Sequence, residues 1–291
     1  MRIVGIVHVY YPELWPEISS CLRGIELRDL FITYSEDSVA DLVRRDFPQA
    51  HFVKCANCGF DVWPFLSVIN RLDLAAYDGV LKLHTKRDIG FACRLHGKNM
   101  SGSRWRTQLL SFVRGERSWI KTLKLLEQDP SVGMIGPVNC LLSRRSMGKS
   151  ELRTYDQAVR LARKIYAPRE KFNGARYVGG TMFLARPQIF RRLKGLYTES
   201  DFEEPRKVHG ETFAHQLERF FGLCVVAEGF RATDPEDSID TWRVQLDFFC
   251  YELLDWLKDF FFQCKVTARG HRLVKILKVP VWHSSLKEVG L

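Results

Sequence analysis

Short apolar runs alternate with longer segments of mixed polarity along the first three quarters of the chain. Such runs are typical of strands buried on both faces of a parallel sheet, and they predict strands at residues 3–9, 30–34, 52–55 and 79–83. The segments between them, at residues 14–22, 39–45 and 62–72, have one polar and one apolar face, and Pro64 suits a first helical turn. This alternation of strand and helix predicts a parallel sheet with crossover helices.

The same alternation continues beyond residue 100. It predicts helices at residues 104–113, 118–126 and 151–165, and strands at residues 132–136 and 177–185. Residues 211–221 are expected to be helical, because their apolar side chains recur on one helix face. The expected fold class is therefore α/β, with a Rossmann-type, mostly parallel sheet flanked by helices.

Residues 231–291 differ from the rest. An acidic turn at residues 234–238 precedes a helix-like stretch at 242–263 that is rich in aromatic residues. We therefore expect a catalytic domain at residues 1–230 and a helical, aromatic-rich, basic appendage at residues 231–291. Charges within the stretch exclude a spanning helix, which needs about 20 predominantly apolar residues. Packing against the first domain or a partner chain is favoured, and contact of the later basic residues with lipid headgroups is the alternative.

Composition narrows the class of protein without naming a reaction. A chain of 291 residues with 46% hydrophobic residues can bury a sizeable core. Its net charge of +10 implies an acidic partner, such as a nucleotide sugar, anionic lipid or nucleic acid. No secretory signal is visible, so the eight cysteines are expected to be reduced in a cytoplasm. Cys55 and Cys58 have C-x-x-C spacing, but no second pair completes a zinc site.

A basic loop follows the apolar run at residues 79–83. Ligands of open α/β sheets bind beyond the carboxyl ends of strands, so His84, Lys86 and Arg87 are expected to face a ligand. Lys and Arg meet phosphate oxygens directly, whereas a carboxylate pair would indicate a metal holding a diphosphate. The loop therefore predicts an anion site, and an ordinary solvated basic loop is the alternative.

Four segments, in a fixed order, carry a family resemblance. They are N-C-G-F-D-V-W-P-F-L at residues 57–66, Y-D-G-V-L-K-L-H-T-K at 77–86, G-T-M-F-L-A-R at 180–186 and G-E-T-F-A-H-Q-L-E-R at 210–219. Together they resemble the rhamnan synthesis F family of bacterial polysaccharide glycosyltransferases over about residues 3–223. Trp63 and Glu211 stand where that family commonly has Gly. The resemblance implies a GT-A-like fold and transfer of a sugar from a nucleoside diphosphate.

The resemblance also implies roles at the donor site. GT-A enzymes commonly hold a metal with an Asp-x-Asp motif at a strand end, and His84-Thr85-Lys86 stands at that place here. We therefore expect no metal cofactor, and we expect Lys86 and His84 to act as catalytic residues in place of the cation. Dependence on a divalent metal is the alternative. The residues expected to bind the donor are Asn57, Gly59, Asp61, Lys82 and Arg87. For Asp61 the alternative is a cap on the following helix.

The acceptor side is less defined. Gly179, Gly180 and Thr181 are expected to bind the acceptor, because paired glycines allow close approach of a substrate to the backbone; a β-bulge is the alternative. Glu211 is the candidate base, by analogy with GT-A enzymes and because a carboxylate at a helix start stays ionised; ordinary stabilisation of the helix end is the alternative. His209, Glu203 and Glu204 are competing candidates.

The expected function is transfer of rhamnose or another hexose to a growing, lipid-linked bacterial surface polysaccharide. The expected location is the cytoplasm, with a peripheral position on the inner face of the inner membrane left open. Other polysaccharide-assembly enzymes are candidate partners. A non-catalytic scaffold of such an assembly is one alternative, and a basic protein that binds polyanions or nucleic acid is another. The sequence contains no recognised nucleic-acid-binding motif, so we expect no nucleic acid to bind. Donor sugar, linkage and anomeric outcome do not follow from the sequence.

Overall fold

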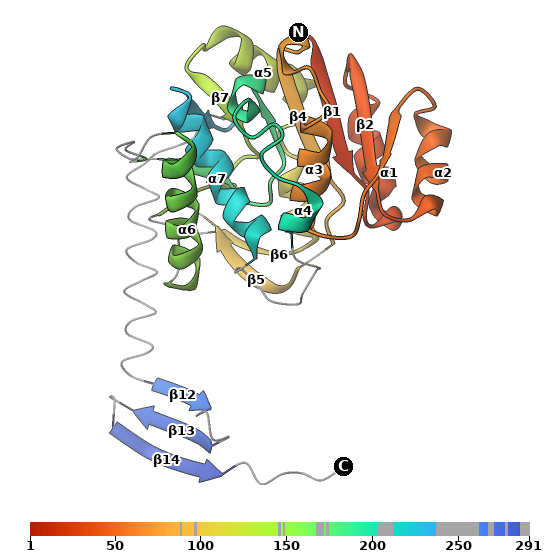
Figure 1. The fold of residues 1–291 in the computed structure, drawn as a ribbon. Helices are drawn as coiled ribbons and strands as arrows, with labels where there is room; N and C mark the ends of the chain where they lie inside the picture. Colours follow the sequence, from red (N-terminus) through yellow and green to blue (C-terminus); the bar gives the residue numbers. More distant parts are fainter. Residues whose placement is uncertain are drawn as a thin grey trace. The chain divides into compact units, whose positions relative to one another are not determined.

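The computed structural model describes residues 1–87, 89–95, 98–144, 147, 149–166, 172, 175–202, 212–236, 262–266, 271–276 and 279–285 (Figure 1). The chain divides into two compact units, Met1–Ile239 and Asp240–Leu291. Within the described residues, no helix is both long enough and apolar enough to cross a membrane.

A seven-stranded sheet forms the centre of the first unit. Its strands are β1 (Ile3–His8), β2 (Asp29–Tyr34), β3 (His51–Lys54), β4 (Gly79–His84), β7 (Val132–Ile135), β10 (Phe183–Ala185) and β11 (Arg231–Thr233), in the spatial order β11-β7-β10-β4-β1-β2-β3. Only β10 runs antiparallel to its neighbours, β4 and β7. The sheet is therefore mostly parallel, and the expected α/β class is confirmed.

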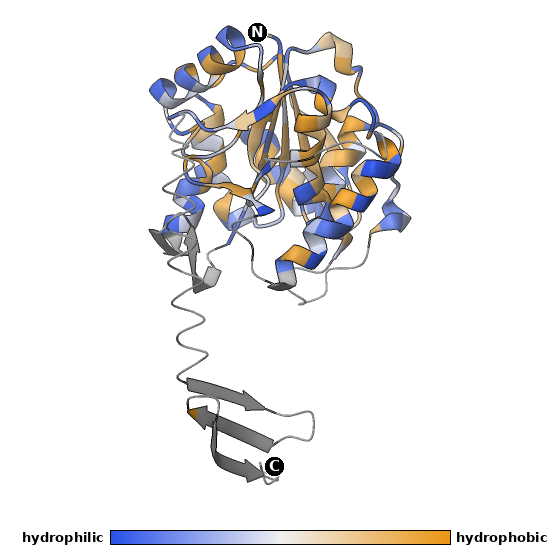
Figure 2. Cartoon of the chain, turned by 90° about the vertical axis from the view of Figure 1, so that its left-hand side faces the viewer, coloured by the Kyte–Doolittle hydropathy of each residue, from blue (hydrophilic) through white to orange (hydrophobic). Residues whose placement is uncertain are grey.

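Helices cover both faces of this sheet. They are α1 (Trp15–Leu22), α2 (Asp37–Asp46), α3 (Val62–Ile69), α4 (Ser103–Leu109), α5 (Glu116–Gln128), α6 (Lys149–Ile165) and α7 (Phe213–Ala227), with short 3₁₀ turns at Pro12–Leu14, Leu74–Ala76, Pro187–Phe190 and Glu199–Asp201. One apolar core lies under α3, α6 and α7, and the other lies under α1, α2, α4 and α5. Strand residues alternate between the two cores, as in β1, where Val4 and Ile6 face one and Ile3 and Val7 the other. Figure 2 shows the resulting apolar centre and polar exterior.

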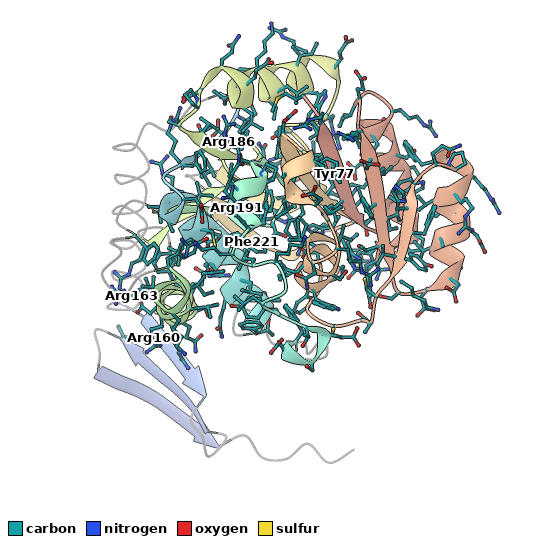
Figure 3. The ribbon with its side chains drawn as sticks, turned by 45° about the horizontal axis from the view of Figure 1, so that its top comes forward. Tyr77, Arg160, Arg163, Arg186, Arg191 and Phe221 are labelled. Atoms are coloured by element: carbon teal, nitrogen blue, oxygen red, sulfur yellow. The ribbon has the colours of Figure 1, made fainter. Side chains whose placement is uncertain are left out.

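An aromatic cluster fixes α7 against the sheet. The ring of Phe221 packs 5.8 Å from Phe65 of α3, 6.1 Å from Phe183 of β10 and 5.9 Å from Phe190. Figure 3 shows Phe221 between α7 and the sheet, whereas Arg160 and Arg163 extend from the outer face of α6. Because buried aromatic pairs contribute about 0.5–1.5 kcal/mol each beyond their area, this cluster holds the middle of α7 in place.

Two small antiparallel sheets accompany the main one. They pair β5 (Ile89–Leu95) with β6 (Lys98–Gly102), and β8 (Leu141–Ser143) with β9 (Arg176–Val178). The prediction of one strand at residues 177–185 is wrong. Gly180 (φ +83°) and Thr181 (φ +52°) adopt left-handed conformations that end β9 and redirect the chain into β10 of the main sheet.

The second unit contains β12 (Phe262–Val266), β13 (His271–Ile276) and β14 (Val279–Ser285), which form an antiparallel sheet in that order. The helix expected at residues 242–263 lies almost wholly outside the described residues, and its last two residues belong to β12. The described residues of the basic segment after it belong to strands β12 and β13. The expected boundary after residue 230 falls directly before β11, which pairs with β7 in the main sheet of the first unit.

Candidate functional site

Four segments meet at the carboxyl ends of the central strands. Neighbouring strands β1 and β4 end at His8 and His84, which are register partners. The loop after β3 supplies Asp61, the turn between β9 and β10 supplies Thr181, and polar contacts extend from there to α7. This is the edge at which open α/β sheets bind their ligands.

A buried lysine lies at the centre of this site. The Lys82 side chain projects from β4 between the rings of Phe65 and Phe183, with Nζ 5.5 Å and 5.9 Å from their centroids. Nζ donates to the Asp61 carboxylate, to the Thr181 carbonyl oxygen at 3.0 Å and to Thr181 Oγ1 at 2.9 Å. The Thr181 hydroxyl in turn donates to Asp61. Three acceptors match the three donors of an ammonium group, so we assign an ionised Lys82–Asp61 pair.

The charge of Asp61 depends on its neighbours. Burial alone would raise the pKa of this carboxyl, but the positive charges around it, those of Lys82 and Lys86 among them, hold its pKa well below the ordinary value. Burial also lowers the pKa of Lys82, against the opposing charge of Asp61. Asp61 occupies the N-cap position of α3 but makes no side-chain cap hydrogen bond there. The helix-cap alternative for Asp61 is therefore wrong, because its carboxylate is directed to Lys82 and Thr181 instead.

Backbone strain surrounds the ion pair on both sides. Phe60 (φ +53°) and Thr181 (φ +52°) are large or β-branched residues in the left-handed region, which normally favours glycine. Each such residue costs on the order of 1–3 kcal/mol and persists only where surrounding contacts enforce it. The three hydrogen bonds between Thr181 and the Lys82–Asp61 pair provide those contacts.

The two histidines at the strand ends are buried and neutral at pH 7. His84 Nε2 donates to the Gly180 carbonyl oxygen at 2.8 Å and lies 3.8 Å from Asp61 Oδ2, while Nδ1 lies 3.3 Å from the Thr85 carbonyl oxygen. His8 Nδ1 pairs with Thr33 Oγ1 at 3.1 Å. Burial lowers the pKa of both side chains to about 4, despite the nearby charge of Asp61. His84 therefore supports the Gly180 turn from inside.

Helix α7 reaches the same turn from the other side. Glu218 accepts a hydrogen bond from the Gly180 amide at 2.8 Å, and Arg219 Nη1 donates to the second Glu218 oxygen at 2.8 Å. Arg219 is itself buried, with its guanidinium 5.3 Å from the ring centroid of Tyr177. A continuous chain of hydrogen bonds thus links α7 through Gly180 to the end of β4.

An outer layer of side chains lies around these buried groups. It contains Tyr10 (41% exposed), Asn57, Phe60 (38% exposed), Lys86 and the half-buried His215. Asn57 Nδ2 donates to the Tyr10 hydroxyl at 3.4 Å, and the ring of Phe60 stands edge-on to that of His215 at 5.5 Å. Thr85 Oγ1 accepts from the amides of Tyr10 and Tyr11 at 3.0 and 2.9 Å, which ties the loop after β1 to the end of β4.

Three of the residues predicted to bind the donor or the acceptor make contacts within the protein instead. Arg87 donates to Glu13 Oε1 at 2.9 and 2.6 Å, and its guanidinium lies 4.3 Å from the Tyr11 centroid. A side chain at Gly59 (φ +63°) would meet the Phe202 ring at 2.5 Å, so Phe202 occupies the space that the missing side chain leaves. Gly179 packs against Leu142, and its amide donates to the Cys140 carbonyl oxygen at 2.8 Å.

Glu211 lies outside the described residues, as do its competitors Glu203, Glu204 and His209. Among the described residues, no group of three or more His, Cys, Asp or Glu side chains is arranged to hold a metal ion. The Cys55 thiol lies 3.3 Å from Ser67 Oγ, and burial raises the pKa of Cys55 and, to about 11, that of Cys58.

Sequence patterns alone did not single out His8, Tyr10, Phe60 and the link from Glu218 to Gly180. His8 and Tyr10 had a usable signal, because they lie at the end of the first buried strand and just beyond it, as His84 and Lys86 do for the fourth. No sequence signal marked Phe60, because the exposure of its ring depends on the left-handed turn that it forms with Gly59.

Comparisons with known proteins match one family profile and two curated relatives. The profile of the family described as rhamnan synthesis protein F matches residues 1–230. A protein named "Uncharacterized protein WxcX" from Xanthomonas campestris pv. campestris (strain B100) is 29% identical over 242 residues, covering 80% of this chain and 33% of its own length. Its counterpart in strain ATCC 33913 is 28% identical over the same lengths. The chain thus spans about a third of the curated relatives it matches. No solved structure matches it.

Proposed function

Because the chain belongs to the rhamnan synthesis protein F family, we propose that it is a GT-A-type glycosyltransferase that uses a nucleoside diphosphate sugar as donor. The acceptor in this proposal is a growing, lipid-linked surface polysaccharide of a bacterium. The observation that carries the proposal is the position of Lys86. Lys86 lies two residues beyond the end of β4, at the ligand-binding edge of the sheet, and its half-buried side chain is close enough to the buried ion pair for its charge to act on Asp61.

Lys86 would neutralise the departing diphosphate. Sugar transfer breaks the bond between the anomeric carbon and the donor phosphate, and negative charge develops on the phosphate oxygens. A preorganised ammonium group stabilises that charge without solvent reorganisation. Because Asp61, Lys82 and His84 are committed to one another and to the Gly180–Thr181 turn, we assign them to holding the shape of the site.

The remaining roles are proposals by analogy. Asn57 and Tyr10 are candidates to recognise the nucleoside, since both are exposed and already share a hydrogen bond. Glu211 is the candidate base for the acceptor hydroxyl, one residue before the N-cap Thr212 of α7. Gly180 and Thr181 are candidates to contact the acceptor. Transfer is proposed to need no metal, and the enzyme is proposed to work at the cytoplasmic face of the inner membrane with other assembly enzymes.

A calorimetric screen against nucleoside diphosphate sugars, with manganese and with EDTA, tests this function. We expect micromolar binding of one donor that survives EDTA, followed by transfer of its radiolabelled sugar to a lipid-linked acceptor. Lys86→Ala should reduce turnover at least 100-fold by analogy with loss of other charge-stabilising groups, where removal costs roughly 3 kcal/mol. Lys121→Ala, on the exposed face of α5, is the matched control and should leave turnover unchanged.

Two results would change the assignment. A folded protein that binds no donor would favour the scaffold alternative. Turnover that requires manganese and disappears in EDTA would show that Lys86 does not replace a cation.

A further inference from the structure

We propose that His215 is a second contact to the donor diphosphate, through a hydrogen bond from its Nε2–H to a phosphate oxygen. This inference rests on the proposed glycosyltransferase function and assigns a role to a side chain in the first turn of α7. His215 reaches the site from a different element than Lys86, so the two would contact the diphosphate from different directions.

The contact with Thr212 engages one of the two ring nitrogens of His215. Thr212 Oγ1 accepts from the His215 amide at 3.5 Å as the N-cap of α7, and it lies 2.7 Å from His215 Nδ1. A separation of 2.7 Å suits donation by the hydroxyl and donation by the ring N–H alike, and the proposal takes the hydroxyl as the donor. The single hydroxyl proton is therefore directed to Nδ1, and the neutral ring carries its own proton on Nε2.

Among the described residues, the ring of His215 has a hydrogen-bond partner at Nδ1 and the ring is half-buried, so the proposal gives Nε2 to the ligand. The ring plane is held on one side by Phe60, at 5.5 Å and 71°. Phe60 adopts its strained left-handed conformation in the loop that also supplies Asp61. This backbone conformation directs the Phe60 ring toward His215 and away from the core.

Burial favours the neutral form of the His215 ring. Burial lowers its pKa, and the nearby Arg219 and Lys86 lower it further, against Glu218 and Asp61, which raise it. A neutral imidazole donates a hydrogen bond without transferring a proton. The Nε2–H bond to the donor is charge-assisted from the start, because both donor phosphates are anionic. When the sugar–phosphate bond breaks, its electron pair leaves with the diphosphate, and the added negative charge strengthens this hydrogen bond.

Two substitutions of His215 separate its nitrogens. The amide nitrogen of Gln lies near the position of Nε2, whereas that of Asn lies near Nδ1. His215→Asn retains a polar contact to Thr212 and loses the outward donor, whereas His215→Gln retains the outward donor. Binding of the free nucleoside diphosphates UDP, dTDP and GDP is measured by calorimetry. We expect His215→Asn to weaken binding of the preferred diphosphate about tenfold, as for loss of one hydrogen bond to a charged group, and His215→Gln to stay within threefold of the wild type.

The corresponding nucleoside without phosphates serves as the control ligand, and neither variant should change its affinity. Equal diphosphate affinity of His215→Asn and the wild type would overturn the proposal, as would equal losses in both variants. Long-range ¹⁵N NMR of the unliganded protein tests the tautomer separately. Protonated Nδ1 would overturn the assignment of the donor, even if no nucleotide binds. A wild type that binds no diphosphate while showing protonated Nε2 would instead refute the proposed function.

Discussion

The buried pair of Lys82 and Asp61 offers the sharpest test of the structure. Lys82→Met leaves the Asp61 carboxylate without its ammonium partner, and Asp61→Asn leaves the ammonium without its counter-charge. Removal of one partner of a buried pair costs about 3–5 kcal/mol, because the other charge stays buried. At about 2–4 °C per kcal/mol for a domain of this size, each single change should lower the thermal midpoint of the first unit by roughly 6–20 °C.

The double variant should be far less damaged than the sum of its parts. With both charges gone, the main loss is the unpaired Thr181 carbonyl oxygen, worth about 1–3 kcal/mol. The expected coupling between the two positions is therefore at least about 3 kcal/mol, a size found only for residues in direct contact. Thermal unfolding of the full chain is followed by far-ultraviolet circular dichroism, with Lys124→Met on the exposed face of α5 as the matched control.

Additive effects in this cycle would refute the reasoning. If the double variant lost as much stability as the two single variants together, the groups would not form one ion pair. Single changes that cost less than about 1 kcal/mol, as for exposed ion pairs, would place the pair in solvent instead.

Two further predictions concern stability. Burial lowers the pKa of His8 and His84 from 6.5 to about 4, so the folded state binds fewer protons than the unfolded state between these values. The free energy of unfolding, measured in urea, should be at its full value above pH 6.5 and should fall as the pH drops toward 4, by up to roughly 3 kcal/mol per histidine. A free energy of unfolding that does not change over this pH range would contradict the burial of the two histidines. Gly59→Ala should cost at least about 2 kcal/mol, since its left-handed backbone and the Phe202 ring at 2.5 Å both oppose a side chain. Gly195→Ala, also at a positive φ (+75°) but with nothing within 4 Å of an added side chain, should cost only about 1 kcal/mol, and equal losses would show that Phe202 does not fill the site.

Local sequence patterns predicted much of the main sheet. Strands buried on both faces leave short apolar runs between amphipathic helices, and β1, β2, β3, β4 and β7 each correspond to one such run. The same rule failed at residues 177–185, where one apolar run contains two strands. The break depends on the left-handed backbone of Thr181, a β-branched residue that no propensity places there.

The inner contacts of the site could not be predicted in the same way. Lys82 contacts Asp61 at a separation of 21 residues and Thr181 at a separation of 99. Sequence alone shows a lysine in an apolar strand, but not whether it turns to solvent or to a buried carboxylate. The resemblance to a family marked Asp61, Lys82 and Thr181 as important, and the structure shows that they contact one another.

The ion pair beneath the site calls for an explanation other than stability. A well-packed apolar pair of similar volume is often as stable as a buried ion pair, or more so. An apolar pair, however, has no directional contacts, and nothing would then hold Thr181 in its left-handed conformation at a cost on the order of 1–3 kcal/mol. The pair provides three hydrogen bonds to Thr181, and Thr181 is preceded by Gly180, which binds both His84 and Glu218. The ion pair, His84 and Glu218 thus hold the Gly180–Thr181 turn from three sides. We therefore interpret the buried charges as fixing the position of this turn, beside which Lys86 and His215 lie.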